Sequence, residues 1–173
     1  HVLVETGTFL GDTVWALRDC FLTIHSIELD PRLHAFARHR LRKLPHVHLH
    51  CGDSSSVLQT LLPTLSEPCL FWLDGHYSGD ATARGADNSP IRQELSLILS
   101  HTVPGHVLLI DDARCFSGAG GYPTLDELRT VIAATNPDLR FAIAEDVVRI
   151  EPRANPLAPS GDAEGSKSVT SKS

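Results

Sequence analysis

The chain has 173 residues, of which 42% are hydrophobic and 21% are charged, a composition that suits one globular domain. Its net charge of −6 argues against a nucleic-acid-binding face as its main purpose. No apolar run approaches the roughly 18 residues of a membrane span, and no secretory signal is visible, so we expect a cytoplasmic protein.

The cysteines and the chain ends add three expectations. The four cysteines are scattered without a C-x-x-C pair, which favours reduced thiols over disulfides or zinc ligands. No Met occurs, so we expect the chain to begin inside a longer protein. Residues 153–173 are dominated by Pro, Gly, Ser and Lys, which predicts a disordered tail behind a domain of residues 1–152.

Short apolar runs with strand character alternate along the chain with segments that carry helix start signals. The predicted strands are Val2–Val4, Leu22–Ile27, Val47–Leu49, Cys69–Leu73, Val107–Ile110, Phe141–Ala144 and Val147–Ile150. Beyond a helix after the first strand, the predicted helices are Arg32–Leu44 behind Asp30-Pro31, a helix from Asp53-Ser54 through Leu62, Ile91–Ser100 behind Ser89-Pro90, and a helix from Thr124 through Ala134.

This alternation predicts an α/β fold in which helices wrap both faces of a mostly parallel, doubly wound, Rossmann-like sheet. The last two strands are separated only by Glu145-Asp146, which is too short for a crossover helix. They are therefore expected to form a C-terminal antiparallel hairpin, which brings the sheet to seven strands.

The segment Glu5-Thr6-Gly7-Thr8-Phe9-Leu10-Gly11 follows the first apolar run directly. A strand that leads through an acid and a glycine-spaced turn into a helix is typical of the nucleotide-binding entrance of doubly wound folds. Glu28 closes the next strand 23 residues after Glu5, near the spacing of a ribose-binding carboxylate. Since Asp30 is available to cap the following helix, we favour ribose binding for Glu28.

Further acids follow the later strands, where open α/β sheets bind their ligands. Asp53 is interpreted equally well as a helix cap or as a binding residue. Asp74 and the pair Asp111-Asp112 end two buried strands, so they converge if these strands are neighbours. Converging carboxylates call for a cation, and oxygen ligands suit Mg²⁺ or another hard divalent ion. The alternative is one capping aspartate and two solvated ones.

A long polar segment, Gly75 to Asn88, follows Asp74 and has the character of a binding loop. His76 is a candidate general base near neutral pH or, equally, a brace for the loop. Arg114, Tyr122 and Asp126 follow the Asp111-Asp112 pair and are candidates for the substrate side. His46, His48 and His50 alternate and share one strand face, which we interpret as an exposed edge strand in preference to a metal site.

Across residues 1–151, including the hairpin, these features resemble class I S-adenosylmethionine-dependent methyltransferases. The resemblance implies that Glu5, Gly7 and Gly11 hold the methionine part of the cofactor, that Glu28 binds the ribose, and that Asp53 with Ser54 approaches the adenine. The middle glycine usual in the first motif is Phe9 here. Helices that normally precede the first strand and cover the cofactor are missing from this sequence.

Two motifs, Leu73-Asp74-Gly75-His76-Tyr77-Ser78 and Ile110-Asp111-Asp112, are similar to those of metal-dependent O-methyltransferases of the catechol and macrocin types. This narrower resemblance implies that Asp74, Asp111 and Asp112 hold Mg²⁺, with His76 and Asp74 as catalytic residues. The implied reaction is O-methylation of a small-molecule hydroxyl, on a sugar or vicinal diol, and homo-oligomerisation stays open.

Two other functions share some of these sequence features. A methyltransferase-like interaction domain of a larger protein is favoured by Phe9 and by the missing N-terminal helices, but the gathered aspartates disfavour it. A nicotinamide-dependent oxidoreductase would require a G-x-G-x-x-G motif and no terminal hairpin, and the sequence departs from both requirements.

Overall fold

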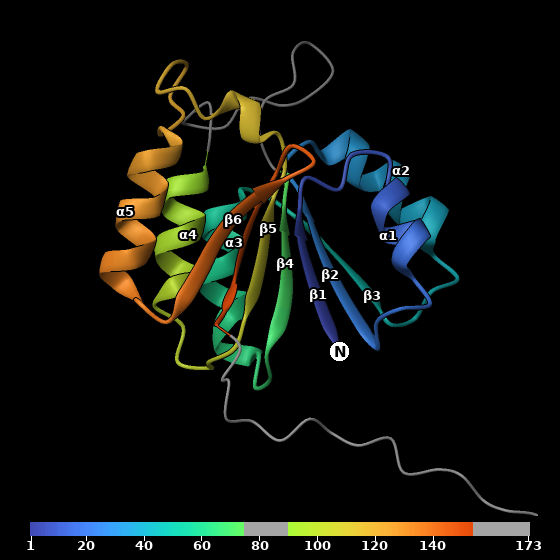
Figure 1. The fold of residues 1–173 in the computed structure, drawn as a ribbon. Coiled ribbons are helices and arrows are strands. Elements are labelled where there is room, and N and C mark those ends of the chain that lie inside the picture. The colour runs from blue at the N-terminus through green and yellow to red at the C-terminus, as the bar shows by residue number, and fades with distance from the viewer. Residues whose placement is uncertain (75–89, 154–173) are drawn as a thin grey trace, which may run out of the picture.

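The computed structural model describes residues 1–74 and 90–153, and these form one seven-stranded sheet between two layers of helices (Figure 1). The strand order is β3-β2-β1-β4-β5-β7-β6, with five parallel strands and an antiparallel β6–β7 hairpin. The strands are β1 (Val2–Thr6), β2 (Thr23–Glu28), β3 (Val47–Cys51), β4 (Cys69–Leu73), β5 (Val107–Ile110), β6 (Leu139–Ala144) and β7 (Val147–Pro152). The predicted fold class is confirmed.

Five α-helices and two short 3₁₀ turns connect these strands in the described part of the chain. The helices are α1 (Asp12–Leu17), α2 (Pro31–Leu41), α3 (Ser54–Leu61), α4 (Ile91–Leu99) and α5 (Leu125–Thr135), and the 3₁₀ turns are η1 (Leu62–Thr64) and η2 (Ala113–Cys115). None of the helices that the structure describes is long and apolar enough to cross a membrane.

Three of the predicted helix caps are present, those of Asp30, Asp53 and Thr124, whereas Ser89, predicted to cap α4, lies outside the described residues. The Asp30 carboxylate accepts hydrogen bonds from the backbone amides of Arg32 and Leu33 at the start of α2. Thr124 and Glu127 form the reciprocal capping box of α5. Each cap satisfies backbone donors that a helix end leaves without partners, which is why the sequence signals these starts so clearly.

Several element boundaries differ from the prediction by one to three residues, and two of these differences are informative. Helix α2 ends at Leu41, three residues before the predicted end at Leu44, and Pro45 supplies the reason, because the residue before a proline avoids the helical region. Strand β1 continues through Thr6, so Glu5 lies inside this strand, where it is almost fully buried.

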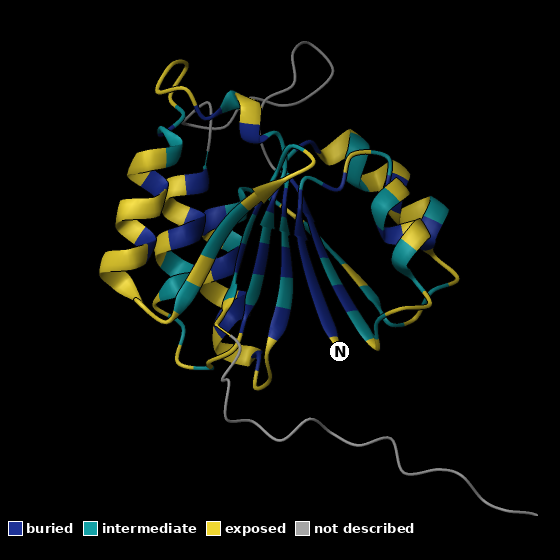
Figure 2. Cartoon of the chain, in the orientation of Figure 1, coloured by how far each residue is buried: buried dark blue, intermediate teal, exposed yellow. Residues whose placement is uncertain are grey.

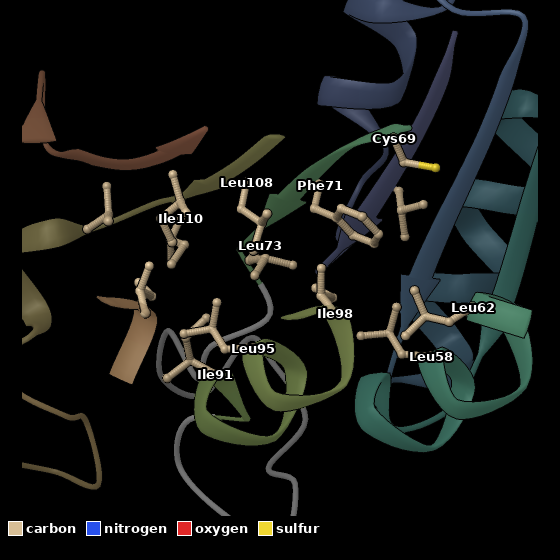
Figure 3. Packing of buried hydrophobic residues seen from close by; sticks show 14 of the residues in the cluster. Leu58, Leu62, Cys69, Phe71, Leu73, Ile91, Leu95, Ile98, Leu108 and Ile110 are labelled. Atoms are coloured by element: carbon tan, nitrogen blue, oxygen red, sulfur yellow. The ribbon is translucent and has the colours of Figure 1, made fainter. Parts of the chain in front are cut away.

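The core has two parts, one on each face of the sheet. The larger cluster packs α3, α4 and α5 against the sheet through residues such as Leu58, Phe71 and Ile98 (Figure 3). The smaller cluster packs α1 and α2 against β1 and β2 through Val14 and Leu41. Strand β1 is buried along its whole length, whereas β4 and β5 alternate between buried and half-buried residues (Figure 2).

Candidate functional site

The candidate site lies at the carboxyl edge of the sheet, where the strand order reverses. Strand β1 pairs with β2 on one side and with β4 on the other, so the chain leaves β1 and β4 in opposite directions. Such a switch point opens a crevice beyond the strand ends, and ligands of open α/β sheets bind there. The described residues that follow the parallel strands are therefore the candidates for binding.

The turn after β1 is built on backbone that favours glycine. Gly7 and Gly11 have φ values of 89° and 77°, in the left-handed region. A Cβ atom added at Gly11 would lie 3.0 Å from Cδ1 of Leu41, so a side chain there would crowd α2 as well. Phe9 also adopts a left-handed φ, of 48°, although it carries a side chain. The turn thus keeps a glycine-type conformation at the position where the motif has lost its glycine.

Glu28 is the last residue of β2 and ties this turn to the second strand. Its Oε2 accepts a hydrogen bond of 2.7 Å from the Phe9 amide, and its Oε1 accepts one of 2.9 Å from the Asp30 amide. The side chain is 6% exposed, so these charge-assisted bonds fix the carboxylate beside the glycine turn. Each carboxylate oxygen has a second lone pair, which leaves acceptor capacity for a ligand.

Glu5 lies beneath the turn instead of at its surface. Ser26, its cross-strand neighbour, donates a hydrogen bond to Oε2 of Glu5, and the Ser26 and Thr8 hydroxyls are 2.5 Å apart. Burial raises the pKa of Glu5 to about 7, although hydrogen bonds from Ser26 and Thr13 oppose the shift. The carboxylates of Asp74 and Glu28 raise this pKa further, which shows that the acids at these strand ends share one electrostatic environment.

The acid after β3 acts as a helix cap. Asp53 accepts hydrogen bonds from the amide and the hydroxyl of Ser56, at 2.9 and 3.0 Å, and Ser54 opens α3 directly after it. Of the two interpretations that the sequence left open for Asp53, the capping role is present in the structure. A role toward adenine stays a prediction for both Asp53 and Ser54.

Asp74 and Asp111 follow neighbouring strands at the same height. Leu73 of β4 pairs with Ile110 of β5, and the Asp111 amide donates a 3.1 Å hydrogen bond to the Leu73 carbonyl. Strands β4 and β5 are thus neighbours, the condition for these aspartates to converge. Asp111 also accepts a hydrogen bond from the Asp112 amide through Oδ1, at 2.9 Å, which orients its side chain.

Asp112 has a different environment from its neighbour. It adopts a left-handed φ of 55°, and its carboxylate forms an ion pair of 2.5 Å with Arg114. The same guanidinium binds Asp146 in the β6–β7 turn. Asp112 therefore belongs to a bridge between the loop after β5 and the hairpin, a partner that sequence spacing gave no means of finding.

The fit to a metal ion is partial. In residues 1–74 and 90–153, no group of three or more His, Cys, Asp or Glu side chains is arranged to hold one. Asp74 and Asp111 still supply oxygen ligands from adjacent strand ends, and Mg²⁺ is commonly held by only one or two carboxylates, with water and substrate completing its shell. His76, the predicted base, lies outside the described residues.

Tyr122 lies close enough to Asp112 and Asp74 to sense their charge. Its ring packs edge-on against Phe116, with centroids 5.6 Å apart. Burial raises the pKa of Tyr122 to about 12, and Cys115, Asp112 and Asp74 add to the shift. Tyr122 thus presents a protonated phenol near these aspartates, whereas Asp126 is exposed in the first turn of α5.

Comparison with known proteins identifies the fold. No protein-family model matches the chain, and no curated protein does. One similar structure is an O-methyltransferase from Bacillus cereus in complex with S-adenosylhomocysteine (SAH), with a TM-score of 0.61 at 16% identity. The match covers 86% of this chain and 72% of the O-methyltransferase chain. SAH-bound PaMTH1 of Podospora anserina, a methyltransferase, has a TM-score of 0.59 at 19% identity, covering 87% and 71%.

A third similar structure is the 23S rRNA methyltransferase ErmE, with a TM-score of 0.57 at 20% identity. It covers 92% of this chain, which spans 64% of the length of ErmE. These likenesses show the class I methyltransferase fold, in agreement with the strand order and the terminal hairpin.

Proposed function

We propose that this chain is an S-adenosylmethionine-dependent methyltransferase. The observation that carries the proposal is the Glu28 carboxylate, which is fixed by the Phe9 amide beside a glycine turn at the switch point of the sheet. A buried acid at the end of the second strand, next to such a turn, suits the two ribose hydroxyls of a nucleoside. SAH is bound in several of the similar structures, which supports S-adenosylmethionine as this nucleoside.

In this proposal, different residues bind the methionine, ribose and adenine parts of the cofactor. The turn from Gly7 to Gly11, above the buried Glu5, holds the methionine part, and Glu28 accepts hydrogen bonds from the ribose. Asp53 and Ser54 lie toward the adenine. S-adenosylmethionine supplies a sulfonium methyl group, and the protein must hold the attacking atom of the acceptor in line with it.

We further propose O-methylation of a small-molecule hydroxyl, on a sugar or a vicinal diol, with a divalent cation such as Mg²⁺. Asp74 and Asp111 would hold this cation at the ends of β4 and β5, with Asp112 as the third predicted ligand in exchange for its Arg114 pair. A cation bound there lowers the pKa of the acceptor hydroxyl. His76, two residues after Asp74 in the sequence, is the proposed base.

Calorimetric titration of S-adenosylmethionine into the purified chain, with Mg²⁺ and then with a chelator, tests both levels of the proposal. We expect micromolar binding in both conditions and at least tenfold weaker binding by Glu28→Ala. Asp19→Asn, which removes an exposed acid paired with Arg18, is the control and should bind like the wild type.

The metal is tested separately. Asp111→Ala should lose Mg²⁺ binding while it keeps its affinity for S-adenosylmethionine, and unchanged Mg²⁺ binding would overturn the metal assignment alone. Absence of cofactor binding in every condition would overturn the enzyme assignment. The methyltransferase-like interaction domain, to which the loss of a glycine at Phe9 points, would then take its place.

A further inference from the structure

Three histidines lie together at the β2–β3 edge of the sheet. His25 of β2 pairs directly with His48 of β3, and His50 is two residues further along β3 on the same face. The alternating histidines in the sequence had indicated only an exposed edge strand. The structure confirms that β3 is an edge strand and adds His25 from its neighbour.

His46 does not belong to this group, although its spacing suggested that it would share the face. It precedes β3, and its Nε2 lies 2.8 Å from the carbonyl oxygen of Arg18 at the end of α1. The His25, His48 and His50 side chains are therefore the three members of the cluster, which we call the edge histidines.

The separations between the rings match those of imidazoles that share one metal ion. The centroids of His25 and His48 are 5.0 Å apart, and those of His25 and His50 are 5.4 Å apart. With metal–nitrogen bonds of about 2.05 Å, two imidazoles in tetrahedral positions have ring centroids about 5.2 Å apart. Two of the three ring pairs are thus near this spacing, but the rings are stacked, with interplanar angles of 25° and 29°, and must turn before their nitrogens face one ion.

The rings are at present joined by a hydrogen bond. Nδ1 of His25 lies 3.1 Å from Nε2 of His50, so one of these nitrogens carries a proton that points at the lone pair of the other. A metal ion would take the place of that proton after both rings turn about their Cβ–Cγ bonds. His48 is exposed and has room to turn as well.

The protonation state favours metal binding. Burial lowers the pKa of His25 to about 4, and His50 and His48 contribute to this shift. Burial also lowers the pKa of His50, with His48 and His34 adding to the effect. Neutral imidazole is the form that binds metals, so protons compete little at pH 7.

We propose that His25, His48 and His50 bind one divalent transition-metal ion, of the Zn²⁺ or Ni²⁺ class, at the β2–β3 edge. Imidazole ligands suit these ions, whereas the carboxylates beyond β4 and β5 suit Mg²⁺. As the side chains now stand, no three potential ligands among the described residues converge on one point, so binding requires the ring rotations. The proposal is independent of the methyltransferase assignment.

Titration of Zn²⁺ and, separately, Ni²⁺ into the full chain at pH 7.5 tests this site. We expect one ion per chain, with affinity at least tenfold lower in His25→Ala and in His50→Ala. Two controls should bind like the wild type: Cys51→Ser removes the exposed thiol next to His50, and His39→Ala removes an exposed histidine on α2. Equal affinity in the wild type and His25→Ala, or loss of binding in Cys51→Ser alone, would overturn the proposal.

A second readout needs no variant and therefore does not depend on the folding of one. Histidine side-chain ¹⁵N spectra of the wild type should show shifts for His25, His48 and His50 on addition of Zn²⁺. The rings of His101 and His106, which form a hydrogen-bonded pair of their own with nitrogens 2.8 Å apart, should stay unchanged. Shifts confined to other histidines would exclude the edge histidines as the site.

Discussion

The backbone amide of Phe9 donates a 2.7 Å hydrogen bond to Oε2 of Glu28, which joins the turn after β1 to the end of β2. The Asp30 amide binds the other oxygen of the same carboxylate. Glu28 therefore has a structural role even before any ligand is present, and its replacement should affect both stability and binding.

Replacement of Glu28 tests this double role. Glu28→Gln keeps one carbonyl acceptor for two amides, so one donor is left poorly satisfied, and we expect a loss of about 1–2 kcal/mol in the free energy of unfolding. Glu28→Ala removes both acceptors and should lose more. Urea unfolding measures the difference, with Asp19→Asn as the exposed control. A fully stable Glu28→Ala would show that these hydrogen bonds contribute nothing net.

At Phe9, in contrast, we expect replacement by glycine to relieve backbone strain. Its φ of 48° is unfavourable for a residue with a Cβ, and its side chain is 43% exposed, so little burial would be lost on replacement. We expect Phe9→Gly to be more stable than Phe9→Ala by about 1 kcal/mol, because only glycine relieves the backbone strain. Chemical denaturation of the two variants gives this difference directly. A more stable Phe9→Ala would mean that the turn is not strained.

Glu5 predicts a pH dependence of stability. Its pKa is about 7 in the folded state against an ordinary value of 4.5, so between these values the folded protein binds more protons than the unfolded chain. Its contribution to stability is thus fully present below about pH 4.5 and is lost as the pH rises through 7, a change of about 3 kcal/mol.

Glu5→Gln should remove this dependence. Relative to the wild type, the variant should gain stability from pH 5 to pH 8, as measured by urea midpoints at each pH. Glu67→Gln, which replaces a half-exposed glutamate near His1, serves as the control and should follow the wild-type profile. Parallel profiles for Glu5→Gln and the wild type would contradict the raised pKa.

Replacement of Arg114 is expected to change Mg²⁺ affinity while it changes the stability of the protein little. Its guanidinium pairs with Asp112 and Asp146 but is 65% exposed, so Arg114→Gln should cost less than about 1 kcal/mol in unfolding free energy. If a divalent cation binds near Asp74 and Asp111, removal of this positive charge should raise the affinity for Mg²⁺ several-fold. Calorimetry tests the affinity, and Arg129→Gln, on the outer part of α5, is the control for a distant cation.

Local patterns in the sequence predict the elements of this protein and its α/β class. Asp30 and Thr124 mark helix starts through contacts within three residues, and the two residues between β6 and β7 allow only a hairpin. These signals are local, because capping and tight turns involve neighbours along the chain. The strand-end positions of Glu28, Asp74 and Asp111 followed from the same local patterns.

The contacts between side chains that are distant in the sequence depend on the tertiary structure. The position of Glu5 under Ser26 and of His25 beside His48 depends on the pairing of β2 with both β1 and β3, which is set by burial over the whole sheet. The Arg114 bridge from Asp112 to Asp146 joins residues that are more than thirty positions apart. No local pattern encodes such contacts, because strand order and register arise from the packing of the complete core.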